Sequence, residues 1–159
     1  MKLFIGIEVL NRWRSQLIRA GKKEIGGILF AEQLSVGEFR IIEATCQNSR
    51  FLGSNTTFMR KGKIARKQVK VLHNKYGGDP KKFNYFGEWH SHPSFPPIPS
   101  ERDRATMCEL IEEQDGAANF LVLLIIKYKS SELQLFAEAY LASGQILECE
   151  IHVENSGST

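Results

Sequence analysis

The feature that most constrains the fold is a series of strand-like segments joined by connections of only a few residues. Three of these segments close the sequence, at residues 118–127, 132–140 and 145–153. Connections this short suit hairpins between antiparallel strands, because a parallel pair needs a crossover of about a dozen residues or more. We therefore expect a mixed or antiparallel sheet.

Helices are interspersed with strands in the rest of the sequence, which makes the fold class α+β. Further strands are predicted at residues 3–7, 24–30, 39–46 and 83–92. Apolar residues at helical spacing predict a helix that ends near Gly21, followed by helices over 60–76 and 100–114. Segment 24–30 (EIGGILF) carries adjacent glycines, which is typical of a core strand that other backbone approaches closely.

The chain is expected to form one domain. Its 159 residues contain no internal repeat and no linker long enough to divide domains. We predict a domain over residues 1–153 and a flexible C-terminal tail over residues 154–159 (ENSGST).

Composition indicates a cytoplasmic protein without a membrane partner. No apolar run approaches the roughly 20 residues that a bilayer span needs, and the N-terminus lacks the pattern of a signal peptide. The three cysteines form no Cys-x-x-Cys pair and fit a reducing compartment as small core residues. The net charge of +3 does not by itself indicate nucleic acid or a membrane surface.

The segment GEWHSHPSFPPIPSERD, residues 87–103, combines residues that bind metals. His90 and His92 lie two apart on a predicted strand, so both imidazoles point to one face. Pro93 ends the strand, and the prolines that follow stiffen the loop before a helix whose N-cap is Ser100 and whose third residue is Asp103. Two histidines and one carboxylate make the ligand set of an open, catalytic zinc site. Taken separately, the histidine pair could be incidental and Ser100 with Asp103 a capping box.

The joint pattern resembles the signature His-x-His-x7-Ser-x-x-Asp of the JAMM (MPN-plus) metalloproteases. The upstream glutamate of that family, followed by small residues and an apolar run, is matched by Glu24-Ile-Gly-Gly-Ile-Leu. The GEWHSHP form and the compact length resemble the prokaryotic JAB branch. The resemblance covers nearly the whole chain and implies a single MPN/JAB-like domain, with a mixed curved β-sheet flanked by helices.

The resemblance also implies a role for each site residue. His90, His92 and Asp103 would bind Zn2+, Glu24 would be the general base, and Ser100 would donate to the developing oxyanion. Glu88 is a rival for the base, because it lies on the same strand face as the histidines. We expect Trp89 and Cys108 to belong to the core.

The implied activity is that of a zinc metalloprotease, a hydrolase of the deubiquitinase-like isopeptidase type. It would cleave at the C-terminus of a ubiquitin-like modifier or of its conjugates. The pathway would be one in which bacteria attach such modifiers to proteins, including in antiviral defence. The partners would be the modifier's extended tail, bordered by residues 53–57 or 93–99, and activating or conjugating enzymes from the same operon.

Other functions stay open at this point. The same chemistry could mature a sulfur-carrier-like protein. A non-catalytic MPN scaffold fits poorly, because such relatives lack the zinc ligands. Residues 92–100 (HPSxxPxPS) also resemble the RadC branch of the same fold, which suggests a nucleic-acid-associated role. Nucleic-acid binding would use the basic segment 60–70 (RKGKIARKQVK), but no aromatic residues interleave with its lysines to stack bases. We therefore do not expect nucleic-acid binding, and interpret this segment as a solvated helix face or a docking surface for an acidic partner.

Overall fold

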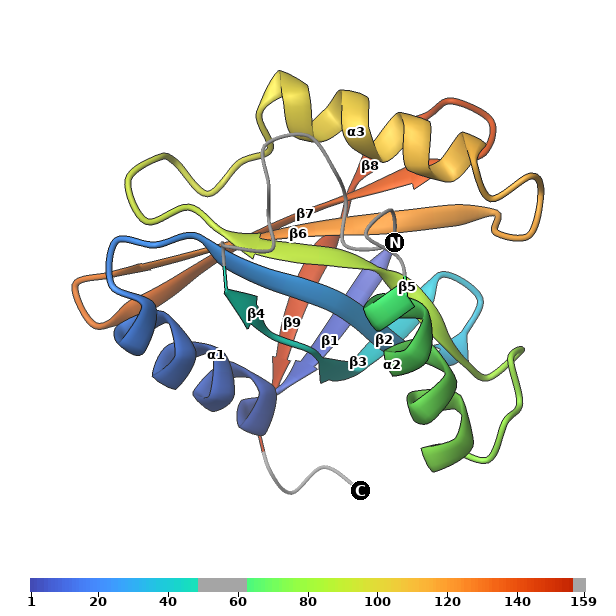
Figure 1. Ribbon diagram of the computed structural model, residues 1–159, viewed down its shortest axis with the longest axis horizontal. Helices are drawn as coiled ribbons and strands as arrows, with labels where there is room; N and C mark the ends of the chain where they lie inside the picture. The colour runs from blue at the N-terminus through green and yellow to red at the C-terminus, as the bar shows by residue number, and fades with distance from the viewer. Residues whose placement is uncertain (49–62, 156–159) are drawn as a thin grey trace.

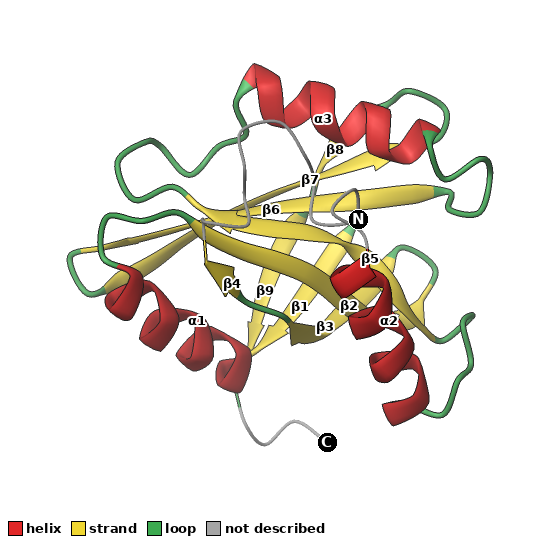
Figure 2. Cartoon of the chain, viewed as in Figure 1, coloured by secondary structure: helices red, strands yellow, loops and turns green. Residues whose placement is uncertain are grey.

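The protein is built on one curved sheet with helices on both faces (Figures 1 and 2). The computed structural model describes residues 1–48 and 63–155. The strands are β1 (Lys2–Gly6), β2 (Ile25–Ser35), β3 (Glu38–Ala44), β4 (Gln47–Asn48), β5 (Phe83–Ser91), β6 (Phe120–Lys129), β7 (Glu132–Leu141), β8 (Ile146–Glu148) and β9 (Glu150–Glu154). The helices are α1 (Ile7–Ala20), α2 (Lys63–Lys75) and α3 (Glu101–Glu112).

The sheet is mixed, as predicted. Its strand order is β8-β7-β6-β5-β2-β3-β1-β9, with β4 paired to β2. The hairpins β2–β3, β6–β7 and β7–β8 are antiparallel, whereas β5–β6, β1–β3 and β1–β9 are parallel. Helix α3 connects β5 to β6, which supplies the crossover that this parallel pair requires.

Helix α1 covers one face of the sheet, and α2 and α3 cover the other. Trp13 of α1 packs against Trp89 of β5, with ring centroids 5.6 Å apart. Side chains alternate along β6, so that Leu124 joins the core under α1 while Leu123 joins the core under α3. The predicted core position of Trp89 is confirmed, since its side chain is fully buried.

The predicted single strand over residues 145–153 is wrong. The structure divides it into β8, which pairs with β7, and β9, which pairs with β1 at the opposite end of the strand order. The change of partner falls at Cys149, whose amide donates to the carbonyl of Ala137, while the next amide, of Glu150, donates to the carbonyl of Met1. One continuous segment therefore joins the two edges and leaves the sheet nearly closed.

Other boundaries differ by a few residues. Strand β2 continues five residues past the predicted end at residue 30, to Ser35, and β9 extends to Glu154, one residue past the predicted domain boundary. The predicted groove segment 53–57, the start of the basic segment 60–70 and the tail residues 156–159 lie outside the described residues. Within residues 1–48 and 63–155, no helix is both long and apolar enough to cross a membrane.

Candidate metal centre

His90 lies near the end of β5 and His92 directly follows it, where neighbouring strands hold the backbone from both sides. His90 pairs with Gly26 of β2 and with Ile125 of β6. The amide of His92 donates to the carbonyl of Ile126 at 2.9 Å. On the other side, the hydroxyl of Ser91 accepts a hydrogen bond from the amide of Ile25 at 3.0 Å. The two imidazoles are therefore carried by a strand end with little freedom to shift.

Asp103 reaches the histidines from the first turn of α3. Ser100 is the N-cap, and its hydroxyl oxygen accepts from the amide of Asp103 at 3.1 Å. The Asp103 carboxylate accepts in return from the amide and the hydroxyl of Ser100, each at 2.7 Å. The predicted capping box is thus present. It orients Asp103 and also engages the Ser100 hydroxyl, which donates to Asp103.

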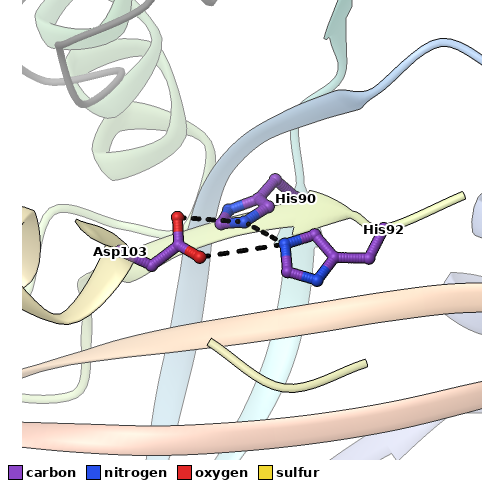
Figure 3. A group of neighbouring side chains, drawn as sticks. All are labelled: His90, His92 and Asp103. Carbon is purple, nitrogen blue, oxygen red and sulfur yellow. Dashed lines mark hydrogen bonds and ion pairs between the residues drawn. The ribbon is translucent and has the colours of Figure 1, made fainter. Parts of the chain in front are cut away.

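The three side chains converge, as Figure 3 shows. The Nε2 atoms of His90 and His92 lie 3.1 Å apart, and the Asp103 carboxylate oxygens lie 3.4 Å from Nε2 of His90 and 3.8 Å from Nε2 of His92. Two ligands bound at about 2.0–2.1 Å to one tetrahedral ion are roughly 3.3–3.4 Å apart. The observed spacings bracket this value, so the residues fit one metal ion. We call this group the His–His–Asp cluster.

The tautomer of His92 suits a metal ligand. Its Nδ1 lies 2.8 Å from the carbonyl oxygen of Pro96, which can only accept, so Nδ1 carries the proton and donates. Nε2 is then left as a lone-pair donor directed at the cluster. A second hydrogen bond of this kind usually accompanies a metal-binding histidine, because it orients the ring and fixes the tautomer.

The electrostatics of Asp103 favour its charged form. Burial alone would raise the pKa of this carboxyl, but the neighbouring His90 and the hydrogen bonds from Ser100 together hold it well below its ordinary value. An ionised carboxylate is the form that binds a metal ion.

The two candidate bases differ in their placement. Glu24 is exposed and immediately precedes β2. Gly26 pairs with His90, so an antiparallel register extended two residues beyond the observed pairs would bring Glu24 opposite His92 and on the same face. Glu88 is only 5% exposed and pairs with Ile28 and Leu123 inside the sheet.

Sequence reasoning missed an ion pair that holds α3 on the sheet. Arg104, the residue after Asp103, donates through Nε and Nη2 to both carboxylate oxygens of Glu138, at 3.0 and 2.6 Å. Glu138 is 6% exposed and also accepts from the hydroxyl of Tyr140 at 2.8 Å. The signal that could have revealed it is a charged residue within the apolar run of β7 over residues 135–141 (LFAEAYL).

Comparisons with known proteins identify the family. Residues 7–137 match the family described as prokaryotic homologs of the JAB domain. The protein named CD-NTase/cGAS isopeptidase from Enterobacter hormaechei subsp. hoffmannii (strain UCI 50) is 30% identical over 127 residues, which cover 78% of this chain and 66% of that protein. This chain therefore spans just under two thirds of that relative's length.

A solved structure supports the fold. The solution structure of protein DSY2949 from Desulfitobacterium hafniense superposes with a TM-score of 0.64 over 97% of this chain and 94% of that chain, at 16% sequence identity. The match over residues 7–137 extends through the His–His–Asp cluster and most of the sheet, which shows that the chain belongs to the prokaryotic JAB branch of the JAMM family.

Proposed function

We propose that this protein is a zinc-dependent isopeptidase that cleaves at the C-terminus of a ubiquitin-like modifier or of its conjugates. The observation that carries the proposal is the convergence of His90, His92 and Asp103, with the tautomer of His92 set by Pro96. The name of the relative that is 30% identical supports the isopeptidase reaction over maturation of a sulfur carrier.

The cluster would bind the zinc ion through Nε2 of each histidine and the carboxylate of Asp103. A bound zinc ion would supply Lewis-acid chemistry, acidifying a water molecule and polarising the scissile carbonyl. Three protein ligands are the usual number for such an open site. The Nδ1–H tautomer of His92 would leave its Nε2 lone pair available to the ion.

Glu24 would move the proton. Its register position opposite His92 supports a role as the general base that takes a proton from the attacking water and delivers it to the leaving amine. The hydroxyl of Ser100 would give up its hydrogen bond to Asp103 and donate a hydrogen bond to the developing oxyanion. Such a donor contributes roughly 3 kcal/mol to transition-state stabilisation.

The substrate is proposed from the relative's name. A conjugate between a ubiquitin-like modifier and a protein of the CD-NTase kind is the first substrate to test, in a bacterial defence pathway with its own activating and conjugating enzymes. An extended tail can bind by adding a strand to a sheet edge, where backbone hydrogen bonds give affinity. The loop over residues 93–99 borders the His–His–Asp cluster and would contact that tail.

The experiment combines metal analysis with a cleavage assay. Purified wild type should hold about one zinc per chain, and His92→Ala should lose most of it, because three ligands are too few to spare one. Fusions that share one modifier tail on different globular bodies should all be cleaved by wild type and not by His92→Ala. Absence of zinc from freshly purified wild type, or equal cleavage by His92→Ala, would contradict the proposal.

A further inference from the structure

The end of β6 holds the loop over residues 93–99 as well as the metal-binding end of β5. Nζ of Lys127 donates to the carbonyl oxygen of Phe95 at 2.7 Å. The next carbonyl along the chain, that of Pro96, accepts the Nδ1 proton of His92 at 2.8 Å. The amide of His92 in turn donates to Ile126, the residue before Lys127. These three hydrogen bonds join His92, the loop and the end of β6 to one another.

The sheet register explains why Lys127 can reach this loop. Ser91 pairs with Ile126 in the parallel β5–β6 ladder, so the next step of the register brings His92 opposite Lys127, on the face that carries the His–His–Asp cluster. Extending the β2–β5 register in the same way predicts Glu24 on the other side of His92, just beyond the ends of β2 and β5. Lys127 is partly buried, and its hydrogen bond to Phe95 lies at the exposed surface.

The loop needs an outside anchor to hold the Pro96 carbonyl in place. Its prolines restrict its conformation, but proline has no amide proton to donate to the sheet. Phe95 is 62% exposed, and its ring contacts the imidazole of His92 only edge-on, with ring centroids 6.3 Å apart. Among the described residues, Lys127 makes a direct hydrogen bond from the sheet to this loop, at the carbonyl of Phe95.

We propose that Lys127 is a positioning residue of the metal site. By holding the carbonyl of Phe95, it keeps the carbonyl of Pro96 in line with Nδ1 of His92, and so keeps Nε2 of His92 directed at the cluster. Lys127 touches neither substrate nor metal in this role. The inference rests on the zinc site proposed above, because the consequence of misaligning His92 is weaker metal binding.

The test compares Lys127→Met, Lys127→Gln and Lys127→Arg with Lys129→Met, a matched control at an exposed lysine on the same strand. Zinc affinity is measured by competition with a chromophoric chelator. The Met and Gln variants should bind zinc roughly 10-fold more weakly, the low end for loss of a residue that orients a ligand. Lys127→Arg keeps a long cationic donor and should stay within about 2-fold of wild type, as should Lys129→Met.

A second readout needs no metal. Two-dimensional nitrogen–proton NMR of the histidine rings in the metal-free protein should give the Nδ1–H tautomer for His92 in wild type and a mixed or broadened signal in Lys127→Met. Thermal unfolding of the metal-free variants reports on the fold. If wild type binds no zinc, the proposed function fails while the NMR comparison still decides the role of Lys127.

Three results would overturn the proposal. Lys127→Met could bind zinc like wild type with an unchanged His92 signal. Lys129→Met could weaken zinc binding as much as Lys127→Met. Finally, the Met and Gln variants could both fail to fold without metal, in which case Lys127 would serve the fold as a whole.

Discussion

Gly26 of β2 lies directly opposite His90 of β5, so closely that no other residue fits at position 26. A Cβ atom at this position would lie 2.3 Å from the carbonyl oxygen of Trp89 and 2.9 Å from Cβ of His90. Real Cβ atoms essentially never approach other heavy atoms so closely, and the backbone oxygen cannot turn away. The glycine therefore lets β2 pair with the strand that carries His90, a proposed metal ligand.

Gly26→Ala should destabilise the protein and weaken zinc binding together. Separating the two backbones costs about 1–3 kcal/mol, the usual range for overpacking a well-packed site, and the shift falls on His90. Urea unfolding of the metal-free protein measures the first effect and chelator competition the second. The control is Gly6→Ala, where a Cβ would meet only the end of the Glu8 side chain at 3.2 Å. It should change stability by less than about 1 kcal/mol. Equal effects of the two substitutions would contradict the role of Gly26.

Glu24→Gln should retain zinc and the native fold but lose cleavage by roughly 100-fold or more, the usual contribution of general-base catalysis. Glutamine keeps the size of the side chain and removes its ability to take a proton. The assay is cleavage of a modifier fusion at matched zinc content. The comparison is Glu88→Gln, which alters a buried residue and should act mainly on stability. Normal cleavage by Glu24→Gln with loss in a folded Glu88→Gln would mean that Glu88 is the base.

The ion pair between Arg104 and Glu138 predicts a pH dependence of stability. Burial would raise the pKa of the Glu138 carboxyl, but hydrogen bonds from Arg104 and Tyr140 lower it below its ordinary value of 4.5. The unfolded chain therefore binds this proton more readily than the folded one. The resulting stabilisation is present above pH 4.5 and is lost as the pH falls through the lower folded pKa.

Glu138→Gln should remove this contribution. Its free energy of unfolding should fall less steeply than that of wild type when urea unfolding is measured from pH 6 down to about pH 3. Glu112→Gln, which changes an exposed carboxylate on the same helix as Arg104, should keep the wild-type slope. An unchanged slope in Glu138→Gln would show that other carboxylates carry the acid dependence.

Local patterns were the part of the fold that the sequence could predict. Leu10, Trp13 and Leu17 share one helix face at regular spacing, and all three are buried on α1. Ser100 and Asp103 are three residues apart, and their capping box begins α3 as expected. These features depend on neighbours within one or two turns, which a single sequence contains directly.

Long-range pairing was the part that could not be predicted. The change of partner at Cys149 depends on how far the sheet curves, which no local periodicity records. The same holds for Arg104 with Glu138, which are 34 residues apart, and for Lys127 with Phe95, which are 32 apart. The convergence of His90 and Asp103 was accessible only through the combined motif, and the chemical roles of these residues stay predictions.

The last prediction concerns the exposed basic side chains on α2, namely Arg66, Lys67 and Lys70. Lys70 comes four residues after Arg66 and three after Lys67, so its side chain neighbours both on the helix surface. Gln68 on the same helix lies 3.5 Å from Gln47 of β4, and β4 pairs with Gly26 beside the metal site. We expect a modifier bound at the proposed site to meet this basic face as a secondary contact. Exposed charge pairs contribute little binding free energy, so this contact should add to the affinity provided by the modifier's tail and not replace it.

Charge reversal of Lys67 and Lys70 to glutamate should raise KM for a modifier fusion by roughly 2- to 10-fold and leave kcat unchanged, because the face binds at a distance from the reacting bond. The effect should shrink as salt rises, since the Debye length falls from about 10 Å at 0.1 M to about 3 Å at 1 M. The control is the double reversal Lys81→Glu with Lys129→Glu, which makes the same change in net charge at exposed lysines elsewhere. A KM that rises equally in the control would indicate a non-specific effect of charge. Salt-sensitive retention of duplex DNA by wild type, lost on reversal of Lys67 and Lys70, would instead assign the face to nucleic acid.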